Sequence, residues 1–362
     1  MGKPLFLSQP VSAIFAGITS SSISSSDEVP GRPNPWRRFA SAFVLGAAVL
    51  LIGILGAAYA IDPYDTGRSG LLKKPGVRPQ GPRTANASRG RDPAFNAAVI
   101  GNSHVQLLSP ERLGALTGLS FVQLTIPATR PKEQFAVIGW FMRHHPDARA
   151  LLIGADNHWC TPDPAIPIEK PFPFWLYSES HFEYLRGLLR YQVVEELPKH
   201  LRYASSMRAA RARPDGYWDY GPLFAAVEEE PEPVLQARLD RRLTENYTGN
   251  VTGRFPVADR FRQVLSTLPR SLAVVLVFPP VYASLLSAPG SPGESADRAC
   301  KAALAEALSS RPAGVVVDWR YDRPELHDPA LFYDHSHYRR ALAELVEKDV
   351  ARALEQAVGK RR

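Results

Sequence analysis

A run of 23 residues without a single charged side chain, from Phe39 to Ile61, constrains this chain more than any other feature. At about 1.5 Å per residue, a helix of this length crosses the hydrocarbon layer of a membrane. A buried helix of a soluble domain rarely lacks polar residues on every face over such a length. We therefore predict a transmembrane helix over residues 39–61. Because Ala58-Tyr59-Ala60 resembles a cleavage site, a cleaved signal peptide is the alternative, but the long run and its long leader favour an uncleaved anchor.

The segments on either side of this run lack the composition of a folded core. Residues 1–38 combine a serine-rich stretch with several prolines and are predicted to form a disordered tail. Residues 62–95 are rich in Gly, Pro, Lys and Arg and are predicted to form an extended stalk or linker. Basic residues flank the run on both sides, and Arg37 and Arg38 adjoin it directly. These two arginines favour a single-pass protein of the cytoplasmic (inner) membrane whose C-terminal domain is exported to the periplasmic side.

The net charge of the chain resides in these N-terminal segments. The chain has 43 Lys and Arg and 36 Asp and Glu. Residues 1–91 hold 11 basic and 4 acidic residues, whereas residues 92–362 hold 32 of each. A nucleic-acid-binding domain concentrates its positive charge on the part that binds. We therefore expect no nucleic-acid partner.

The chain contains two cysteines, Cys160 and Cys300. Two are too few for a disulfide framework or for a cysteine-rich zinc site. One disulfide between them and two free thiols are equally compatible with the sequence.

From residue 96 onward, short apolar runs alternate with helical patterns. The runs lie at residues 97–101, 121–126, 150–154, 272–278 and 314–319. The last helical pattern covers residues 340–358, where apolar residues repeat at helical spacing. Continuous apolar strands separated by helices are typical of a parallel sheet that is covered on both faces. The fold class predicted for residues 96–362 is therefore α/β, with an insertion at about residues 160–256.

Polar residues gather where strands of this sheet are predicted to end, which is where open α/β sheets bind their ligands. The sequence Gly101-Asn102-Ser103-His104 follows the first strand, Gly154-Ala155-Asp156-Asn157-His158 follows the third, and Asp334-His335-Ser336-His337 lies in the last loop. Serine is a weak nucleophile that needs a histidine base, itself oriented by a carboxylate. Ser103, His337 and Asp334 supply these groups and are predicted to converge in one cleft. An ordinary capping turn at Ser103 is the alternative.

These residues resemble the SGNH (GDSL-like) hydrolase superfamily, in particular its membrane-anchored members such as the alginate O-acetylation proteins and the D-alanyl-lipoteichoic acid protein. The resemblance covers about residues 95–358. It implies a flavodoxin-like three-layer sandwich with a central parallel sheet. It also implies catalysis by Ser103 as the nucleophile, His337 as the base and Asp334 as the group that orients His337. An acyl-ester or glycan substrate and a partnership with envelope polysaccharide machinery follow from the same resemblance.

The chain departs from the family pattern around the expected oxyanion hole. Asn102 replaces the aspartate of the first motif, and Ala128 stands nearest to the glycine of the second motif, whose backbone N–H donates to the oxyanion. The third motif, Gly-x-Asn-Asp, is absent, although Asp156 and Asn157 follow Gly154 in a different order. We therefore take Ala128, Asn157, Asp156 and Asn102 as candidates for oxyanion or substrate binding. For Asn157, a role in capping the following turn is the structural alternative.

Three further patterns have competing interpretations. Asp334, His335 and His337 supply part of a metal site, but no remote ligand is evident, so we expect neither a metal nor a cofactor. His104 and His158 either line the cleft or lie on the surface. The aromatic segment at residues 171–177 either stacks on sugar rings or packs on the core as a hydrophobic lid.

Taken with the resemblance, the residues predict a membrane-anchored serine esterase or O-acyltransferase of the acetyl type that acts on an envelope polysaccharide or glycan. Water as the acceptor of the acyl group gives an esterase, and a sugar hydroxyl gives a transferase. The alternative is a catalytically silent SGNH-like scaffold or binding protein in envelope polysaccharide assembly.

Overall fold

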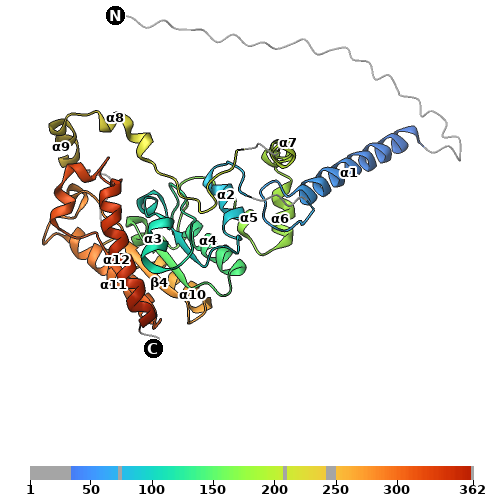
Figure 1. The fold of residues 1–362 in the computed structure, drawn as a ribbon. Helices are drawn as coiled ribbons and strands as arrows, with labels where there is room; N and C mark the ends of the chain where they lie inside the picture. The colour runs from blue at the N-terminus through green and yellow to red at the C-terminus, as the bar shows by residue number, and fades with distance from the viewer. Residues whose placement is uncertain (1–33, 72–75, 207–209, 242–249, 360–362) are drawn as a thin grey trace, which may run out of the picture. The chain divides into compact units, whose positions relative to one another are not determined.

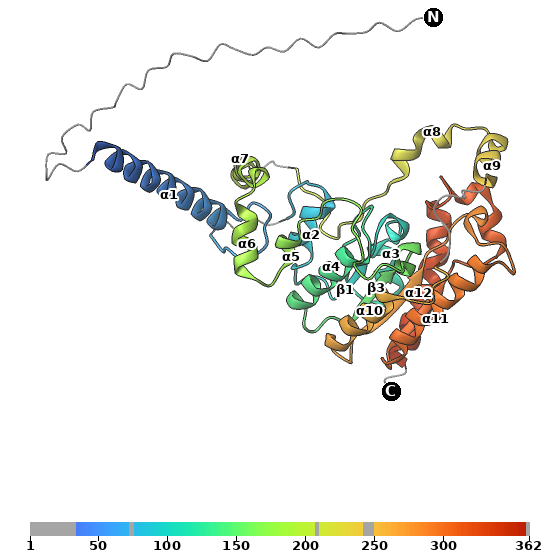
Figure 2. The same cartoon turned by 180° about the vertical axis from the view of Figure 1, so that it is seen from behind.

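The computed structural model describes residues 34–71, 76–206, 210–241 and 250–359 (Figures 1 and 2). The chain divides into two units, one up to Gly53 and one from Ile54 onward. Helix α1 (Pro35–Ile61) is long and apolar enough to cross a membrane, and few of its side chains are buried. It begins before the predicted span, so the tail predicted over residues 1–38 ends earlier. The rest of that tail, residues 1–33, lies outside the described residues.

Five parallel strands form the sheet of the second unit. They are β1 (Ala97–Ile100), β2 (Phe121–Gln123), β3 (Ala150–Gly154), β4 (Ala273–Phe278) and β5 (Gly314–Asp318). Their order is β2-β1-β3-β4-β5, and every neighbouring pair is parallel. Every residue of β1 to β4 is buried, which explains why these strands appear in the sequence as continuous apolar runs. The order places β2 and β3 on opposite sides of β1, and in open parallel sheets the end of such a strand is where ligands bind.

Helices cover both faces of the sheet, as the sequence predicts. One face carries α4 (Pro131–His144), α10 (Pro256–Thr267) and α11 (Pro292–Ser309), and the other carries α3 (Pro110–Thr117) and α12 (Arg340–Gly359). Alternate strand residues supply the two cores. Ile153 and Leu276 lie in the first core, whereas Leu152 and Val275 lie in the second. The end of β1 is thereby held between two packed layers.

The segment between β3 and β4 contains a series of short helices. They are α5 (Phe174–Tyr177), α6 (His181–Leu188), α7 (Tyr191–Ser205), α8 (Ala225–Glu228) and α9 (Glu232–Asp240). The aromatic segment at residues 171–177 packs inward, since Tyr177 is buried and Phe172 and Trp175 contact the core. The ring of Trp175 lies 5.7 Å from the ring of Tyr64. This segment is therefore part of the hydrophobic packing, and stacking on sugar rings is not supported.

Residues 62–95 differ from the extended stalk that their composition predicts. They include helix α2 (Pro82–Arg89), and Tyr64, Ala85 and Ala87 are buried. The indole N–H of Trp140 donates to the carbonyl oxygen of Ala87 at 3.1 Å. The described parts of the segment, residues 62–71 and 76–95, therefore belong to the folded unit. Their packing relies on small alanines and on hydrogen-bonded backbone groups, which leave little apolar signal in the sequence.

Candidate active site

Ser103 lies in a sharp turn at the end of β1. Asn102 caps the single 3₁₀ turn Ser103–Val105, because its Oδ1 atom accepts the backbone N–H of His104 at 3.1 Å. A Cβ atom on Gly101 would lie 2.5 Å from the Val105 side chain, so glycine is the residue that fits this turn. The turn leaves the Ser103 side chain partly exposed beyond the edge of the sheet.

The structure brings Ser103, His337 and Asp334 together. His337 Nε2 lies 2.9 Å from Ser103 Oγ, and His337 Nδ1 lies 2.8 Å from Asp334 Oδ2. Asp334 Oδ1 also accepts the backbone N–H groups of Ser336 and His337, each at 2.8 Å. His335 faces elsewhere, with its Nε2 atom 3.1 Å from the carbonyl oxygen of Arg241. Of the two histidines in the last loop, the one predicted as the base is therefore the one that faces Ser103.

The charge on Asp334 sets the tautomer of His337. Burial raises the pKa of Asp334, but hydrogen bonds and charge attraction from His337, together with backbone N–H groups, outweigh burial and lower it to about 2. Asp334 is consequently ionised at neutral pH and accepts a hydrogen bond from the protonated Nδ1 of the imidazole. Neutral His337 then has a free lone pair on Nε2, which can accept the Ser103 hydroxyl proton.

Two aromatic residues from the insertion enclose His337, and neither was predicted from the sequence. The ring of Tyr220 lies 5.2 Å from the imidazole of His337, and the ring of Phe224 lies 5.5 Å from it. The Tyr220 hydroxyl donates to the carbonyl oxygen of Tyr338 at 2.8 Å, across 118 residues of sequence. Because no local pattern links such distant residues, only the tertiary fold identifies them as walls of the site.

Asn102, Asp156 and His104 form a polar cluster beside Ser103. Asn102 Nδ2 donates to Asp156 Oδ2 at 2.5 Å and to the carbonyl oxygen of Thr129 at 3.3 Å. Asn102 and Asp156 are buried. Since each already has a protein partner, they support the turns that carry Ser103 and Asn157. The structure thus gives them a structural role and does not support the substrate contact expected from the sequence.

His104 lies between this cluster and the base. Its Nδ1 atom is 3.7 Å from Asp156 Oδ2, and its ring is 5.6 Å from the ring of His337. Burial lowers the pKa of His104 to about 4, although the charge of Asp156 opposes part of that shift. His104 is therefore neutral at neutral pH and adds no positive charge beside His337. Of the two interpretations left open by the sequence, the structure supports a place in the site for His104.

Ala128 and Asn157 stay as candidates for the oxyanion hole. Ala128 has φ of 54°, in the left-handed region that favours glycine. Asn157 opens the 3₁₀ turn Asn157–Cys160, but Asp156 caps that turn by accepting the backbone N–H of His158 at 3.0 Å. The capping role considered for Asn157 thus falls to Asp156. The Asn157 side chain is partly exposed.

We expect Ala128→Gly to raise the free energy of unfolding by up to about 1 kcal/mol, since glycine adopts the left-handed conformation without the steric cost that alanine pays. Urea denaturation measures the change. Ala302→Gly, at an exposed position in the interior of α11, is the control and should lower the free energy of unfolding by about 1 kcal/mol. Equal losses for both variants would contradict the strain at Ala128.

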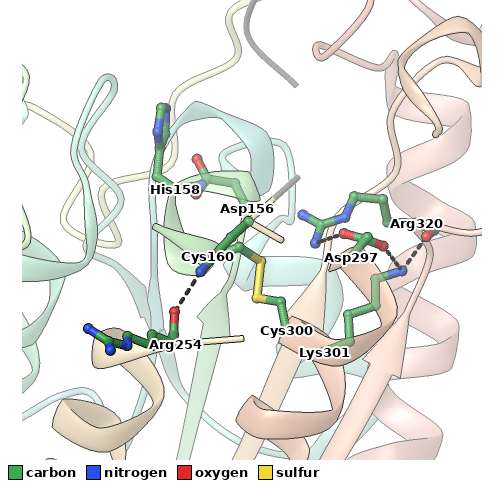
Figure 3. The surroundings of a disulfide bond; sticks show 9 residues. Asp156, His158, Cys160, Arg254, Asp297, Cys300, Lys301 and Arg320 are labelled. Atoms are coloured by element: carbon green, nitrogen blue, oxygen red, sulfur yellow. Dashed lines mark hydrogen bonds and ion pairs between the residues drawn. A yellow bond between two sulfur atoms is a disulfide. The ribbon is translucent and has the colours of Figure 1, made fainter. Parts of the chain in front are cut away.

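A disulfide links the turn that carries Asn157 to helix α11. Figure 3 shows Asp156, His158 and Cys160 on this turn, with Cys160 bonded to Cys300. The two Cα atoms are 5.6 Å apart, and the bond closes a loop of 140 residues. Next to Cys300, Lys301 pairs with Asp297 at 3.0 Å (Figure 3). The disulfide therefore ties one loop of the site to the layer of helices behind it.

Replacing both cysteines with alanine should lower the free energy of unfolding by about 2–5 kcal/mol, because a long closed loop restricts the unfolded chain. Urea denaturation of the two proteins gives the difference. Dithiothreitol should destabilise the wild-type protein and leave the double variant unchanged. A reductant effect of the same size on both proteins would argue against this disulfide.

No group of three His, Cys, Asp or Glu side chains is placed to hold a metal ion within the part of the chain that the structure describes. In the last loop, His335 and His337 face different partners, at Arg241 and Ser103. The metal interpretation of this loop therefore finds no support in its geometry.

Comparison with known proteins finds no match, whether to a family model, to a curated protein or to a solved structure. The chemistry of this site is accordingly inferred from its own geometry and from the sequence motifs.

Proposed function

We propose that this protein is a membrane-anchored serine esterase or O-acyltransferase of the SGNH type. The continuous chain of hydrogen bonds from Asp334 through His337 to Ser103 is the observation that carries the proposal. Ser103 Oγ attacks an acyl carbonyl carbon while His337 Nε2 takes the hydroxyl proton. The bond to the leaving alcohol then breaks, and His337 returns the proton to that alcohol. Asp334 stabilises the imidazolium that forms in between.

The acyl group leaves Ser103 by the reverse steps. His337 removes a proton from the acceptor, which attacks the acyl-serine, and Ser103 Oγ regains its proton from His337. Water as the acceptor completes hydrolysis, and a glycan hydroxyl completes transfer. The acetyl group and the envelope glycan are proposed on the motifs shared with the SGNH superfamily.

The arrangement of the sheet supports the assignment to a flavodoxin-like fold. The strand order β2-β1-β3-β4-β5 is that of flavodoxin-like doubly wound sheets, whose ligands bind at the point where the order reverses. Ser103 follows β1 and Asp156 follows β3, the two strands at that point. The candidate site thus lies where this fold class places its ligands.

The first residues of the second unit favour an uncleaved anchor over a signal peptide. Ala58 is fully buried, and the Tyr59 hydroxyl donates to the carbonyl oxygen of Arg68 at 3.3 Å. Cleavage after Ala60 would remove both residues from the packing of the folded unit. The Cys160–Cys300 disulfide favours an oxidising compartment, and we place residues 62–362 on the periplasmic side of the inner membrane.

A fusion of alkaline phosphatase to the C-terminus tests this topology, since that enzyme matures only after export. We expect an active fusion and a protein that keeps its N-terminal segment. An inactive phosphatase fusion, together with fluorescence from a green fluorescent protein fused at the same end, would place the domain in the cytoplasm.

Covalent labelling with a fluorophosphonate tests the nucleophile, because this reagent traps only serines activated by a neighbouring base. Mass spectrometry should find the adduct on the peptide that contains Ser103. Ser120→Ala, an exposed serine at the opposite edge of the sheet, is the matched control and should label fully. A folded protein that neither reacts nor hydrolyses acetyl esters would favour the silent scaffold.

A further inference from the structure

Helix α7 carries two apolar stripes, and the rest of the protein covers only one of them. One stripe faces the core, where Val193 is buried and Leu197 packs against it. A second stripe follows helical spacing and is exposed; it consists of Tyr191, Val194, Pro198 and Leu201. Tyr191 is 72% exposed, and Val194 and Leu201 are 44% and 43% exposed. An exposed apolar stripe of this kind indicates that something apolar outside the described part of the chain covers it.

The preceding helix α6 continues this exposed surface. Phe182 is 73% exposed, and Leu189 at the end of the helix is also exposed. We call the exposed apolar side chains of the two helices the α6–α7 face; it comprises Phe182, Leu189, Tyr191, Val194, Pro198 and Leu201. Soluble proteins bury side chains of this kind when they gather on one surface, unless a partner covers them.

Contacts of α6 place this face next to the end of α1. The ring of Tyr184 in α6 lies 6.1 Å from the ring of Tyr59, and its hydroxyl donates to Asp62 Oδ1 at 3.1 Å. Asp62 is the residue that follows α1, and residues 54–61 belong to the same unit as α6 and α7. Figures 1 and 2 show α6 beside this end of α1 from opposite sides. If α1 spans a bilayer, its end lies among the head groups, and α6, which contacts that end, lies close to this level. Helix α7 follows α6 after two residues.

The chemistry of the face fits a lipid interface better than a protein partner. Tyrosine side chains such as Tyr191 are enriched at the boundary between head groups and acyl chains, and phenylalanines such as Phe182 are common on the apolar face of interfacial helices. Arg190 and Arg202, both exposed, lie at the two ends of the stripe on α7. Arginine side chains in this position extend their guanidinium groups to lipid phosphates while the apolar stripe enters the acyl region.

We propose that the α6–α7 face lies in the phospholipid interface of the leaflet in which α1 ends. The proposal rests on the proposed membrane anchor and is independent of the chemistry at Ser103. A second attachment beside α1 restricts rotation of the folded unit about its anchor. It thereby holds the Ser103 site in a constant orientation toward the membrane surface.

Thiol-specific fluorescent probes on the full-length protein in vesicles of phosphatidylcholine and phosphatidylglycerol test this contact. Both native cysteines are in the disulfide, so the probe reacts only with an introduced cysteine. Val194→Cys and Leu201→Cys report on the face, whereas Gln192→Cys and Lys199→Cys, seven residues apart on the polar side of α7, are matched controls. We expect nitroxide lipids to quench the face probes at least about two-fold more than the controls.

A probe at Leu50→Cys separates failure of this proposal from failure of the anchor. Quenching at Leu50 with equal quenching of the face and control probes would overturn the lipid contact and leave the anchor intact. No quenching at Leu50 would overturn the anchor and the lipid contact together. In detergent, the face probes could instead become more shielded as the protein concentration rises. This result would show that a second copy covers the face and would also overturn the proposal.

Discussion

Ser103→Ala is expected to lower the turnover of a chromogenic acetyl ester by about 10⁴- to 10⁶-fold. Ser103 Oγ is the atom 2.9 Å from His337 Nε2, and without it no acyl-enzyme can form. The loss should appear in kcat, since substrate binding does not need the hydroxyl. Stopped assays with a long incubation give the residual rate.

Three controls test whether the loss of turnover comes from the serine mechanism and not from unfolding. Ser120→Ala should keep wild-type activity. His337→Ala should lose about as much as Ser103→Ala, and the double variant should lose little more, because the two residues act as one unit. Ser103→Ala should change the free energy of unfolding by no more than about 1.5 kcal/mol, the value of one hydrogen bond. A folded Ser103→Ala protein with wild-type turnover would refute the serine mechanism.

Asp334→Asn is expected to lower kcat by about 10⁴-fold while the protein stays folded. The asparagine amide can donate to His337 Nδ1, which shifts the imidazole proton to Nε2. His337 then donates to Ser103 and cannot take its proton. A comparison of kcat and KM for the two proteins measures the effect, and a change confined to KM would contradict the orienting role of Asp334.

The same variant has a characteristic dependence on pH. Folding lowers the pKa of Asp334 from 3.8 to about 2, so the ionised carboxylate stabilises the fold above its unfolded pKa. This contribution should disappear as the pH falls from about 4 through about 2. The difference in unfolding free energy between wild type and Asp334→Asn should therefore be constant above about pH 4 and decrease below it. If the difference in unfolding free energy instead grew as the pH fell, the result would contradict a lowered pKa of Asp334 in the folded protein.

Local patterns in the sequence determined the sheet, the apolar helix α1 and the candidate residues Ser103, His337 and Asp334. The apolar runs at residues 97–101 and 272–278 match β1 and β4 closely, because strands buried on both faces need apolar residues at every position. Asp334 and His337 are three residues apart, so one turn of the chain brings them into contact. For the uncharged run at residues 39–61, its length was enough to predict a long apolar helix.

The tertiary structure alone decided what surrounds these elements. The described residues between 62 and 95 are folded and pack through small alanines, although the glycine- and proline-rich composition of the segment resembles that of a linker. Asp156 accepts a hydrogen bond from Asn102, and Tyr220 reaches His337 from the insertion. These contacts join residues that are more than fifty positions apart. Periodicity and turn chemistry describe neighbours along the chain, whereas contacts between distant residues arise only when the layers of the fold close against each other.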